Sequence, residues 1–347
     1  MKAMTVVPGV AGSAAVTEFD GPVGDGEVLV QGLVLGICAT DVEIVSGEFG
    51  TAPVGVDRLV LGHESVGRVI DAPPNGGVAA GDLVVGIVRR PDPVPCSACA
   101  AGSWDMCRNG RYTERGITGL HGYGAEQWRV ERDFVVSVPD RLGELAVLVE
   151  PASVVTKAWE QIDRIVATMP FAPRTVLITG AGPIGLLAAL LAAQRGFEVY
   201  VLDRVTEGPK PRLVADLGAV YHAGSISDLP PADIVVECTG APTVVIDAMR
   251  RNARCGVTCL TGVSSGGHKF EVDVGAAARR LVLQNDVVFG SVNANRAHYE
   301  AAAAAIDTAD RDWLSRLVTR RVPLDSWPDA VARDPADVKV VVELNPS

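Results

Sequence analysis

Three residues with strong metal-binding side chains lie in short, distinctive motifs. Cys38 lies in GICATD, His63 lies beside Glu64 in LGHESVG, and Glu150 lies farther along in VLVEPAS. A thiolate, an imidazole and a carboxylate brought together form a catalytic zinc site with one position left for substrate. Such a site polarises an alcohol oxygen, and Thr40 is close enough to Cys38 in sequence to carry the alcohol proton away. Spacing alone leaves other interpretations open, because Cys38 could be a small buried apolar residue, His63 a core histidine and Glu150 a helix cap.

A second group of thiols follows in RRPDPVPCSACAAGSWDMC, where Cys96, Cys99 and Cys107 are spaced like three ligands of a structural zinc ion. Such an ion takes four protein ligands, and the fourth is not evident. The chain has seven cysteines, an odd number, which favours free thiols and metal ligands over a disulfide framework.

A glycine-rich motif begins at residue 180, where TVLITGAGPIGLLAAL places Gly180, Gly182 and Gly185 in the spacing G-x-G-x-x-G. The motif follows an apolar strand and opens a helix, which is the context of a Rossmann dinucleotide site. The first glycine allows the tight turn, the second lets the pyrophosphate approach, and the third lets helix and strand pack closely. The two residues that complete the loop are Pro183 and Ile184.

An acidic residue stands about twenty positions after this loop, as the Rossmann site requires. It is Asp203, at the end of FEVYVLD, where it would bind the ribose 2′-hydroxyl and repel a 2′-phosphate. Arg204 is next to it and could accept a 2′-phosphate or stack on adenine. NAD is therefore the favoured coenzyme, and use of NADP stays open.

The elements that must position these residues differ between two parts of the chain. Short apolar runs broken by Gly and Pro over the first 140 residues predict a β-barrel-like domain. From residue 175 apolar strands alternate with helices, which predicts a parallel sheet covered on both faces. The segment 338–344, VKVVVEL, predicts a closing strand that resembles the first domain. We therefore expect two domains, 1–155 with 296–347 and then 156–295, as the length of the chain also suggests.

Composition excludes several classes of function. The 347-residue chain is 48% hydrophobic and 21% charged, as globular proteins are. Its net charge is −11 and it has no Lys/Arg block, so nucleic acid is not an expected partner. No apolar run is long enough to span a bilayer, and MKAMTVVPGV lacks the features of a signal peptide. We expect a cytoplasmic protein without a membrane partner.

The motifs GICATD, GHE, the cysteine-rich segment, GAGPIG and the C-terminal strand stand in the order found in zinc-containing medium-chain alcohol dehydrogenases. Over nearly its whole length the chain resembles this superfamily, and it is most similar to the microbial glucose 1-dehydrogenases. The closer similarity lies in RR (89–90), WDMCRNGRYTERGI, HGYGAE, FGSVNANRAHYEAA and RLVTRRVPL. The resemblance implies an α/β protein with a GroES-like β-barrel catalytic domain and a Rossmann coenzyme domain with a doubly wound parallel sheet.

The resemblance also implies roles for individual residues. Cys38, His63 and Glu150 match the catalytic zinc ligands, and Glu64 matches a residue that joins or leaves the metal. The positions matching sugar contacts are Thr40, Glu114, Glu150 and Asn293. Beyond the glycine loop, Asp203 and Arg204, the expected coenzyme contacts are Thr239, Thr261, Val263, Ser291 and Asn293.

Four positions depart from the family pattern. Val88 stands where the glucose enzymes tend to carry asparagine, and Val154 where they carry aspartate, which puts glucose itself in doubt because unpaired sugar hydroxyls lower discrimination. Glu43 stands where many relatives place a proton-relay histidine, so a relay through Thr40 to water is expected. In the cysteine-rich segment, the first of four family cysteines falls on Pro93. Asp92 is a candidate oxygen ligand there, and a metal-free segment is the alternative.

These expectations define a function and its rivals. The favoured function is zinc-dependent hydride transfer from the C1 hydroxyl of glucose to NAD(P), giving the lactone, in carbohydrate metabolism. A polyol, cyclitol or amino-sugar dehydrogenase using the same zinc chemistry is the second candidate. A non-catalytic nucleotide-binding protein is disfavoured by the intact zinc and proton-relay residues. Relatives form dimers or tetramers through the Rossmann domain, so a homo-oligomer is expected.

Overall fold

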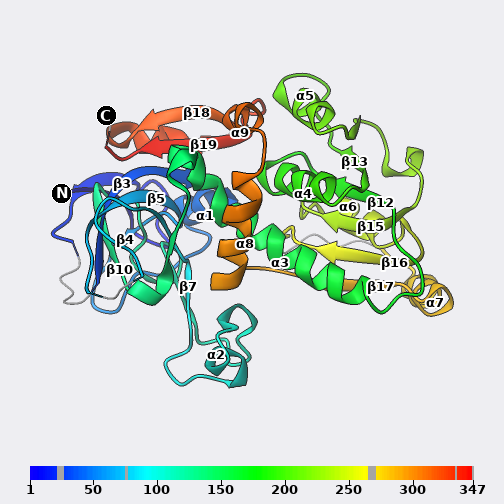
Figure 1. Cartoon of the computed structure of the whole chain (residues 1–347), viewed down its shortest axis with the longest axis horizontal. Coiled ribbons are helices and arrows are strands. Elements are labelled where there is room, and N and C mark those ends of the chain that lie inside the picture. Colours follow the sequence, from blue (N-terminus) through cyan, green and yellow to red (C-terminus); the bar gives the residue numbers. More distant parts are fainter. Residues whose placement is uncertain (22–26, 75–76, 265–270, 333, 346–347) are drawn as a thin grey trace. The chain divides into compact units, whose positions relative to one another are not determined.

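A computed structural model describes residues 1–21, 27–74, 77–264, 271–332 and 334–345. The chain divides into two compact units. The first comprises Met1–Ser153 and Asn293–Ser347, and the second comprises Val154–Val292. Both contain β-sheet, but their strands pair in different ways (Figure 1).

The first unit is built on sheets in which most neighbouring strands are antiparallel, whereas β18 (Val318–Pro323) and β19 (Lys339–Glu343) pair in parallel. One has the order β2 (Ala15–Glu18), β1 (Lys2–Val6), β4 (Leu59–Val60). The larger has the order β11 (Val135–Ser137), β6 (Leu83–Gly86), β5 (Glu64–Asp71), β3 (Val28–Ile37), β19 (Lys339–Glu343), β18 (Val318–Pro323), and β10 (Gln127–Val130) also pairs with β3. Alternate residues of β3 are buried at its start, as expected of a strand with one face on a core. Apolar side chains from these strands form that core together with Tyr123, Trp128 and Trp327.

The last strand of the chain belongs to this first unit. β19 pairs antiparallel with β3, with Val340 opposite Ile37 and Glu343 opposite Val34. The predicted closing strand is therefore confirmed. Its first residue, Lys339, comes to lie beside the segment that carries Cys38.

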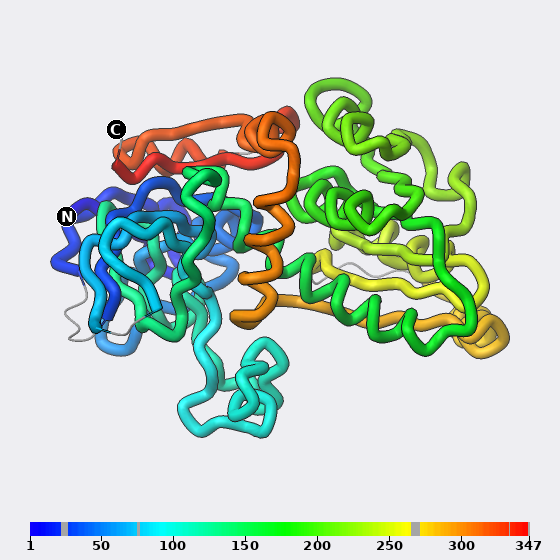
Figure 2. The backbone as a smooth tube through the Cα atoms, viewed as in Figure 1, coloured from blue at the N-terminus to red at the C-terminus, as the bar shows by residue number. Residues whose placement is uncertain are grey.

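A segment that we call the cysteine lobe, residues 91–112, leaves the barrel after β7 (Arg89–Arg90) and returns at β8 (Thr113–Arg115) (Figure 2). It contains the short helix α2 (Ser97–Ala100) and a single turn η1 (Trp104–Met106). β7 and β8 pair at its base, with Arg89 opposite Glu114, and β9 (Gly119–Leu120) extends that small sheet.

Helices of the first unit flank the sheets. They are α1 (Ala39–Ser46), α8 (Arg296–Asp307) and α9 (Arg311–Leu317), with η2 (Arg132–Phe134), η3 (Asp140–Leu148) and η5 (Leu324–Val331) as 3-10 turns. Helix α3 (Val149–Val166) begins in the first unit and continues into the second.

The second unit holds a six-stranded parallel sheet. Its order is β14 (Val220–His222), β13 (Glu198–Leu202), β12 (Thr175–Thr179), β15 (Ala232–Glu237), β16 (Asn252–Leu260), β17 (Val287–Gly290). Counting from β12, this is the order 3-2-1-4-5-6 of the Rossmann fold. Its helices are α4 (Pro183–Gln194), α5 (Pro209–Asp216), α6 (Pro242–Ala248) and α7 (Val274–Gln284), with η4 (Ile226–Asp228) as a 3-10 turn. The predicted α/β fold class with a parallel Rossmann sheet is confirmed. No helix in the described ranges is both long and apolar enough to cross a membrane.

Candidate zinc and coenzyme sites

The pairing of β3 with β5 brings Cys38 and His63 together. Gly36 lies opposite Glu64 in this ladder, so the residues just beyond β3 and just before β5 are neighbours. Cys38 Sγ and His63 Nε2 are 3.1 Å apart. His63 is 5% exposed, and Cys38 is half-buried at the N-cap of α1. A thiol and an imidazole are therefore held side by side at the edge of the barrel core.

Asp41 lies close to both Cys38 and His63. Its Oδ2 accepts a hydrogen bond of 2.9 Å from the Cys38 backbone N–H, and its Oδ1 lies 3.5 Å from His63 Nδ1. Burial raises the pKa of Asp41, while the charge of His63 lowers it. Burial by itself would lower the pKa of His63, but the charges of Cys38 and Asp41 bring it well above its usual value. The second imidazole nitrogen thus faces a carboxylate, as is common for metal-binding histidines.

Glu64 is held by a lysine from the far end of the chain. Lys339 Nζ donates to both Glu64 oxygens, at 2.8 and 2.6 Å, and to the Ile37 carbonyl at 3.1 Å. Burial would lower the pKa of Lys339, but Glu64 and Cys38 raise it. Only glycine fits at position 36, because a Cβ there would lie 2.0 Å from Glu64 Oε2. Glu64 is therefore fixed close to the Cys38–His63 pair.

The ligand atoms of Cys38, His63 and Glu64 all lie within 4.8 Å of one another. Glu150, the second residue of α3, is not within this group but is electrostatically coupled to it. Burial, together with the charge of Glu64, raises the pKa of Glu150 to about 7, although His63 and Lys339 act in the opposite direction.

This donor set fits a divalent zinc ion. Sulfur, nitrogen and carboxylate oxygen are the ligands that zinc takes. The acidic side chains of the cluster are Cys38, Asp41, Glu64 and Glu150, whereas Lys339 is its one permanently cationic member in the described part of the chain. Each acidic group in this cluster destabilises the charged form of the others. A bound cation would offset this repulsion and stabilise their charged forms.

A second polar group stands at the base of the cysteine lobe. Glu114 Oε1 accepts hydrogen bonds from Arg89 Nε at 3.0 Å, Arg89 Nη2 at 2.9 Å and Asn293 Nδ2 at 2.8 Å. Arg89 also lies over the ring of Tyr112, 3.6 Å from its centroid. Among the described residues, none donates to Glu114 Oε2, which leaves that oxygen available to a ligand hydroxyl.

Thr40, the expected proton-relay residue, is half-buried on the first turn of α1.

The two valines at expected sugar-contact positions lie in different surroundings. Val88 is 2% exposed and belongs to the apolar core of the first unit, and its backbone N–H donates to the Tyr299 hydroxyl at 3.3 Å. Val154 is half-buried on α3. Neither side chain can offer a hydrogen bond.

The glycine loop of the second unit has the geometry of a dinucleotide site. Gly180 has φ of +90°, the left-handed region that glycine favours. A Cβ on Gly185 would lie 1.8 Å from the Gly180 carbonyl oxygen, so the close contact of α4 with the loop requires glycine. At Gly182, the N-cap of α4, a Cβ would meet no atom within 4 Å. The helix N-terminus therefore faces open space, where a phosphate can approach the backbone N–H groups.

Asp203 follows β13 and ties the loop together. Its Oδ2 accepts from Ala181 N at 2.7 Å, its Oδ1 accepts from Val205 N at 3.0 Å, and Lys210 Nζ lies 3.6 Å away. Arg204 is exposed beside it. The acidic residue thus stands next to the glycine loop, with two cationic side chains close to it in sequence.

The remaining expected coenzyme residues of this unit follow the carboxyl ends of parallel strands, where α/β proteins bind ligands. Thr239 follows β15, Thr261 and the exposed Val263 follow β16, and Ser291 follows β17. The fully buried Glu237 organises this edge, accepting hydrogen bonds from Thr239 N at 2.8 Å and Gly240 N at 3.2 Å. Asn293 lies in the first unit.

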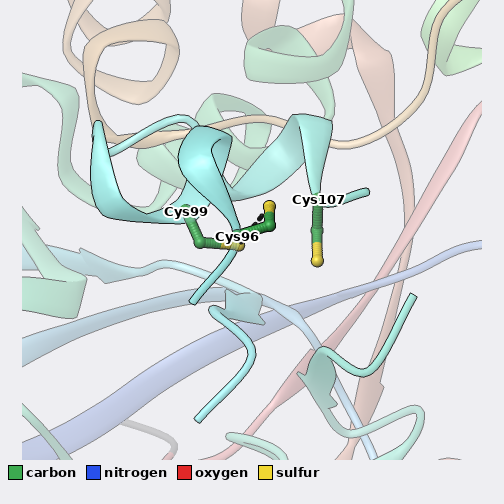
Figure 3. Close-up of side chains that lie close together, drawn as sticks. All are labelled: Cys96, Cys99 and Cys107. Atoms are coloured by element: carbon green, nitrogen blue, oxygen red, sulfur yellow. Dashed lines mark hydrogen bonds between the residues drawn. The ribbon is translucent and has the colours of Figure 1, made fainter. Parts of the chain in front are cut away.

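The cysteine lobe brings its three thiols together (Figure 3). The sulfur atoms of Cys96, Cys99 and Cys107 lie within 4.8 Å of one another, and those of Cys96 and Cys99 are 3.7 Å apart. Hydrogen bonds, of which the one from the Arg108 backbone N–H contributes most, lower the pKa of Cys96 to about 6. Burial raises the pKa of Cys99.

Asp92, the candidate fourth ligand, is engaged elsewhere. Its Oδ1 accepts from Val94 N at 2.8 Å, and its Oδ2 accepts from Asn109 Nδ2 at 2.8 Å and Arg111 Nε at 3.2 Å. Its carboxylate is not part of the group of sulfur atoms. Asp92 acts here as a turn residue that shapes the lobe.

Several residues of these sites were not anticipated as partners. Asp41, Lys339, Arg89 and Glu237 each hold an expected site residue or loop. Asp41 follows Cys38 by three residues in GICATD, and Glu237 ends an apolar strand, so both carried a local signal. Lys339 carried none, because its partner is 275 positions away.

Comparison with known proteins agrees with this geometry. Residues 143–344 match the model of the family described as "Glucose dehydrogenase C-terminus", and residues 24–140 match "Alcohol dehydrogenase GroES-like domain". Glucose 1-dehydrogenase of Methanocella arvoryzae is 39% identical over 99% of both chains. Glucose 1-dehydrogenase 1 of Caldivirga maquilingensis is 40% identical over 100% of this chain and 99% of that one.

A solved structure has the same fold over its whole length. It is glucose dehydrogenase of Haloferax mediterranei in complex with NADP, zinc and gluconolactone, with a TM-score of 0.92, 34% identity and 100% of both chains covered. The chain described here therefore belongs to the glucose dehydrogenase family of the zinc-dependent medium-chain alcohol dehydrogenases.

Proposed function

We propose that this protein is a zinc-dependent sugar dehydrogenase that transfers hydride from the C1 hydroxyl of glucose to NAD(P), giving the lactone. The observation that carries the proposal is the convergence of Cys38, His63 and Glu64, whose ligand atoms lie within 4.8 Å of one another. The complex of the Haloferax mediterranei enzyme with NADP, zinc and gluconolactone supports both the coenzyme class and the product.

Cys38, His63 and Glu150 are the proposed zinc ligands, with Glu64 as an alternative ligand that Lys339 holds near the site. When bound, zinc supplies Lewis-acid polarisation of the alcohol oxygen. Asp41 fixes the imidazole of His63 so that Nε2 stays directed at Cys38. Thr40 moves the hydroxyl proton of the substrate toward water.

The proposed sugar contacts are Thr40, Glu114, Glu150 and Asn293. Arg89 and Asn293 fill one oxygen of Glu114, so its other oxygen is left to accept from a sugar hydroxyl. A carboxylate held this way accepts strong, directional hydrogen bonds from hydroxyl groups.

Both coenzymes are proposed, with NAD favoured. Asp203 would bind a ribose 2′-hydroxyl and repel a 2′-phosphate. Lys210, 3.6 Å from Asp203, and the exposed Arg204 weaken that repulsion and could receive the phosphate. The acidic Asp203 and the two nearby cationic side chains together support use of both NAD and NADP.

A second substrate class, a polyol, cyclitol or amino sugar, is favoured by Val88 and Val154. Val88 is fully enclosed in apolar core, so no hydrogen-bonding side chain can act from that position. A site that lacks two donors or acceptors discriminates less against rings with different hydroxyl patterns.

We propose that residues 1–155 with 296–347 act as the catalytic domain and residues 156–295 as the coenzyme domain. A homo-oligomer through the second unit is supported by β17, an edge strand, and by the exposed apolar Val282 and Leu283 beside it in sequence. All seven cysteines are free thiols, which supports a reducing compartment such as the cytoplasm. We propose neither a nucleic-acid nor a membrane partner.

The test is formation of reduced coenzyme by purified, zinc-replete protein with D-glucose and a panel of aldoses, polyols and cyclitols, each with NAD and NADP. Rapid turnover of glucose to the lactone supports the proposal. Turnover restricted to another ring would keep the zinc chemistry and replace the substrate. If protein that binds coenzyme and zinc forms no reduced coenzyme with any of these substrates, the proposed activity is refuted.

A further inference from the structure

The cysteine lobe carries three thiols that the proposed hydride transfer does not use. We propose that Cys96 and Cys99 form a reversible dithiol–disulfide pair, which a hydroperoxide oxidises and small-molecule thiols reduce. This chemistry is independent of the sugar dehydrogenase activity, so either proposal can fail alone.

The positions of the two sulfur atoms suit this reaction. Cys96 and Cys99 are separated by two residues, and their sulfur atoms are 3.7 Å apart (Figure 3). Cys96 is half-buried and is the N-cap residue of α2, whereas Cys99 is 8% exposed. An oxidant therefore reaches Cys96 more easily, and Cys99 is placed to attack it from the protein side.

The backbone stabilises the attacking form of Cys96. Arg108 N donates to Cys96 Sγ at 3.4 Å, and this bond is stronger when the sulfur is a thiolate. The thiolate is the nucleophile in thiol oxidation and exchange. The residues beside the pair, Ser97 and Ala100, are exposed, so small reagents can approach the turn.

The cysteine lobe lacks a fourth ligand with which its three thiols could bind a structural metal ion. Pro93 offers no ligand atom, and both oxygens of Asp92 accept hydrogen bonds from Val94, Asn109 and Arg111. Within the described ranges, no fourth Cys, His, Asp or Glu joins the group of three sulfur atoms. A structural zinc ion requires four protein ligands, so the thiols are left to react.

The chemistry balances with hydrogen peroxide as oxidant. The Cys96 thiolate attacks one peroxide oxygen, so that an S–O bond forms, the O–O bond breaks and hydroxide leaves to take up a proton. Cys99 then attacks the Cys96 sulfur, forming the S–S bond and breaking the S–O bond, and its thiol proton leaves with the oxygen as water. Two thiols and one peroxide give one disulfide and two waters. Two equivalents of a small thiol reverse the change by exchange through a mixed disulfide.

The experiment uses the full-length protein, purified with a reductant that is then removed. It is treated with a small excess of hydrogen peroxide, alkylated, digested and mapped by mass spectrometry, before and after dithiothreitol. The proposal expects a Cys96–Cys99 disulfide in most chains, with each thiol recovered on reduction. Cys107→Ser is the matched control and should still form it, while Cys96→Ser and Cys99→Ser should not.

Three results would overturn the proposal. One is a disulfide that joins Cys107 to either partner in the wild type. Another is oxidation of Cys96 to sulfinic or sulfonic acid with Cys99 still reduced. The third is a metal ion that protects the three thiols and whose content falls by about one per chain in Cys96→Ser but not in Cys38→Ser. Because the first two are measured on the wild-type protein, misfolding of a variant cannot hide them.

Discussion

Arg89 and Glu114 form a pair in which two of the three guanidinium nitrogens of Arg89 donate to a single carboxylate oxygen. Arg89 Nε and Nη2 lie 3.0 and 2.9 Å from Glu114 Oε1, and Asn293 Nδ2 lies 2.8 Å from the same atom. The side chains of Arg89 and Glu114 are 6% and 12% exposed. This pair joins β7 to β8 at the base of the cysteine lobe and leaves Glu114 Oε2 to a ligand.

Arg89→Lys should therefore weaken sugar binding without loss of zinc. Lysine keeps the charge but not the planar pair of donors, so Glu114 loses its fixed orientation. A hydrogen bond to a charged group is worth about 1.5–3 kcal/mol, so we expect KM for the sugar to rise about ten- to a hundredfold, with a smaller change in kcat. Steady-state kinetics and zinc analysis measure both. An unchanged KM would show that Glu114 does not touch the substrate.

Cys38→Ala and His63→Ala should each remove zinc and turnover while the coenzyme site persists. The two side chains supply two of the proposed ligands, and the lost polarisation is worth several kcal/mol, or about a thousandfold or more in rate. Atomic emission gives the zinc content, and quenching of tryptophan fluorescence by NADH gives coenzyme binding. Full turnover after the metal has been stripped with a chelator would contradict the proposed mechanism.

The sequence predicts the Rossmann unit well because its elements depend on local patterns. TVLITG and ADIVVE are short, mostly apolar runs typical of strands buried on both faces, and both form strands of the parallel sheet. The helix α7 was not predicted, and none of its described residues is buried. Strand β18 was not predicted, because the adjacent Arg320 and Arg321 interrupt its apolar residues.

The candidate site was predictable where it lies within motifs and hidden where it depends on long-range pairing. Cys38 and His63 are both in short motifs, and the β3–β5 ladder places them together. Lys339 reaches Glu64 only because β19 pairs with β3, a contact between the two ends of the chain. Asp92 was a plausible ligand from its sequence position alone, but its local turn hydrogen bonds decide its orientation.

Stability in acid should depend on Glu131. Burial would raise the pKa of this carboxyl, but hydrogen bonds and charge from Arg90, with Arg115, lower it to about 2. Because the folded-state pKa lies below the unfolded one, the carboxylate stabilises the protein at neutral pH, and this contribution is lost as pH falls from about 4.5 toward about 2. Urea unfolding of Glu131→Gln should show a lower midpoint than the wild type at neutral pH, and the difference should shrink at about pH 3. An equal difference at both pH values would disprove the pairing as its source.

Asp203→Asn should move the coenzyme preference toward NADP. Asparagine keeps one acceptor oxygen for Ala181 N but removes the charge that repels a 2′-phosphate, while Lys210 and Arg204 remain. The ratio of kcat/KM for NADP to that for NAD should rise about tenfold or more, since one charge-assisted interaction is exchanged for another. The glucose KM is the internal control and should stay constant. A ratio that does not change would mean that Asp203 serves only to hold the glycine loop.

Gly185→Ala and Gly182→Ala, three residues apart in one loop, should fail in different ways. A Cβ at position 185 would lie 1.8 Å from the Gly180 carbonyl oxygen, so α4 must move and the second unit should lose about 1–3 kcal/mol of stability or more. A Cβ at position 182 meets no protein atom within 4 Å, and φ there is −79°, which alanine adopts freely. Gly182→Ala should therefore keep the wild-type melting temperature yet lose coenzyme affinity, because the methyl group occupies the space of the pyrophosphate. Thermal unfolding with and without NADH separates the two effects, and equal coenzyme affinity in Gly182→Ala and the wild type would place the pyrophosphate elsewhere.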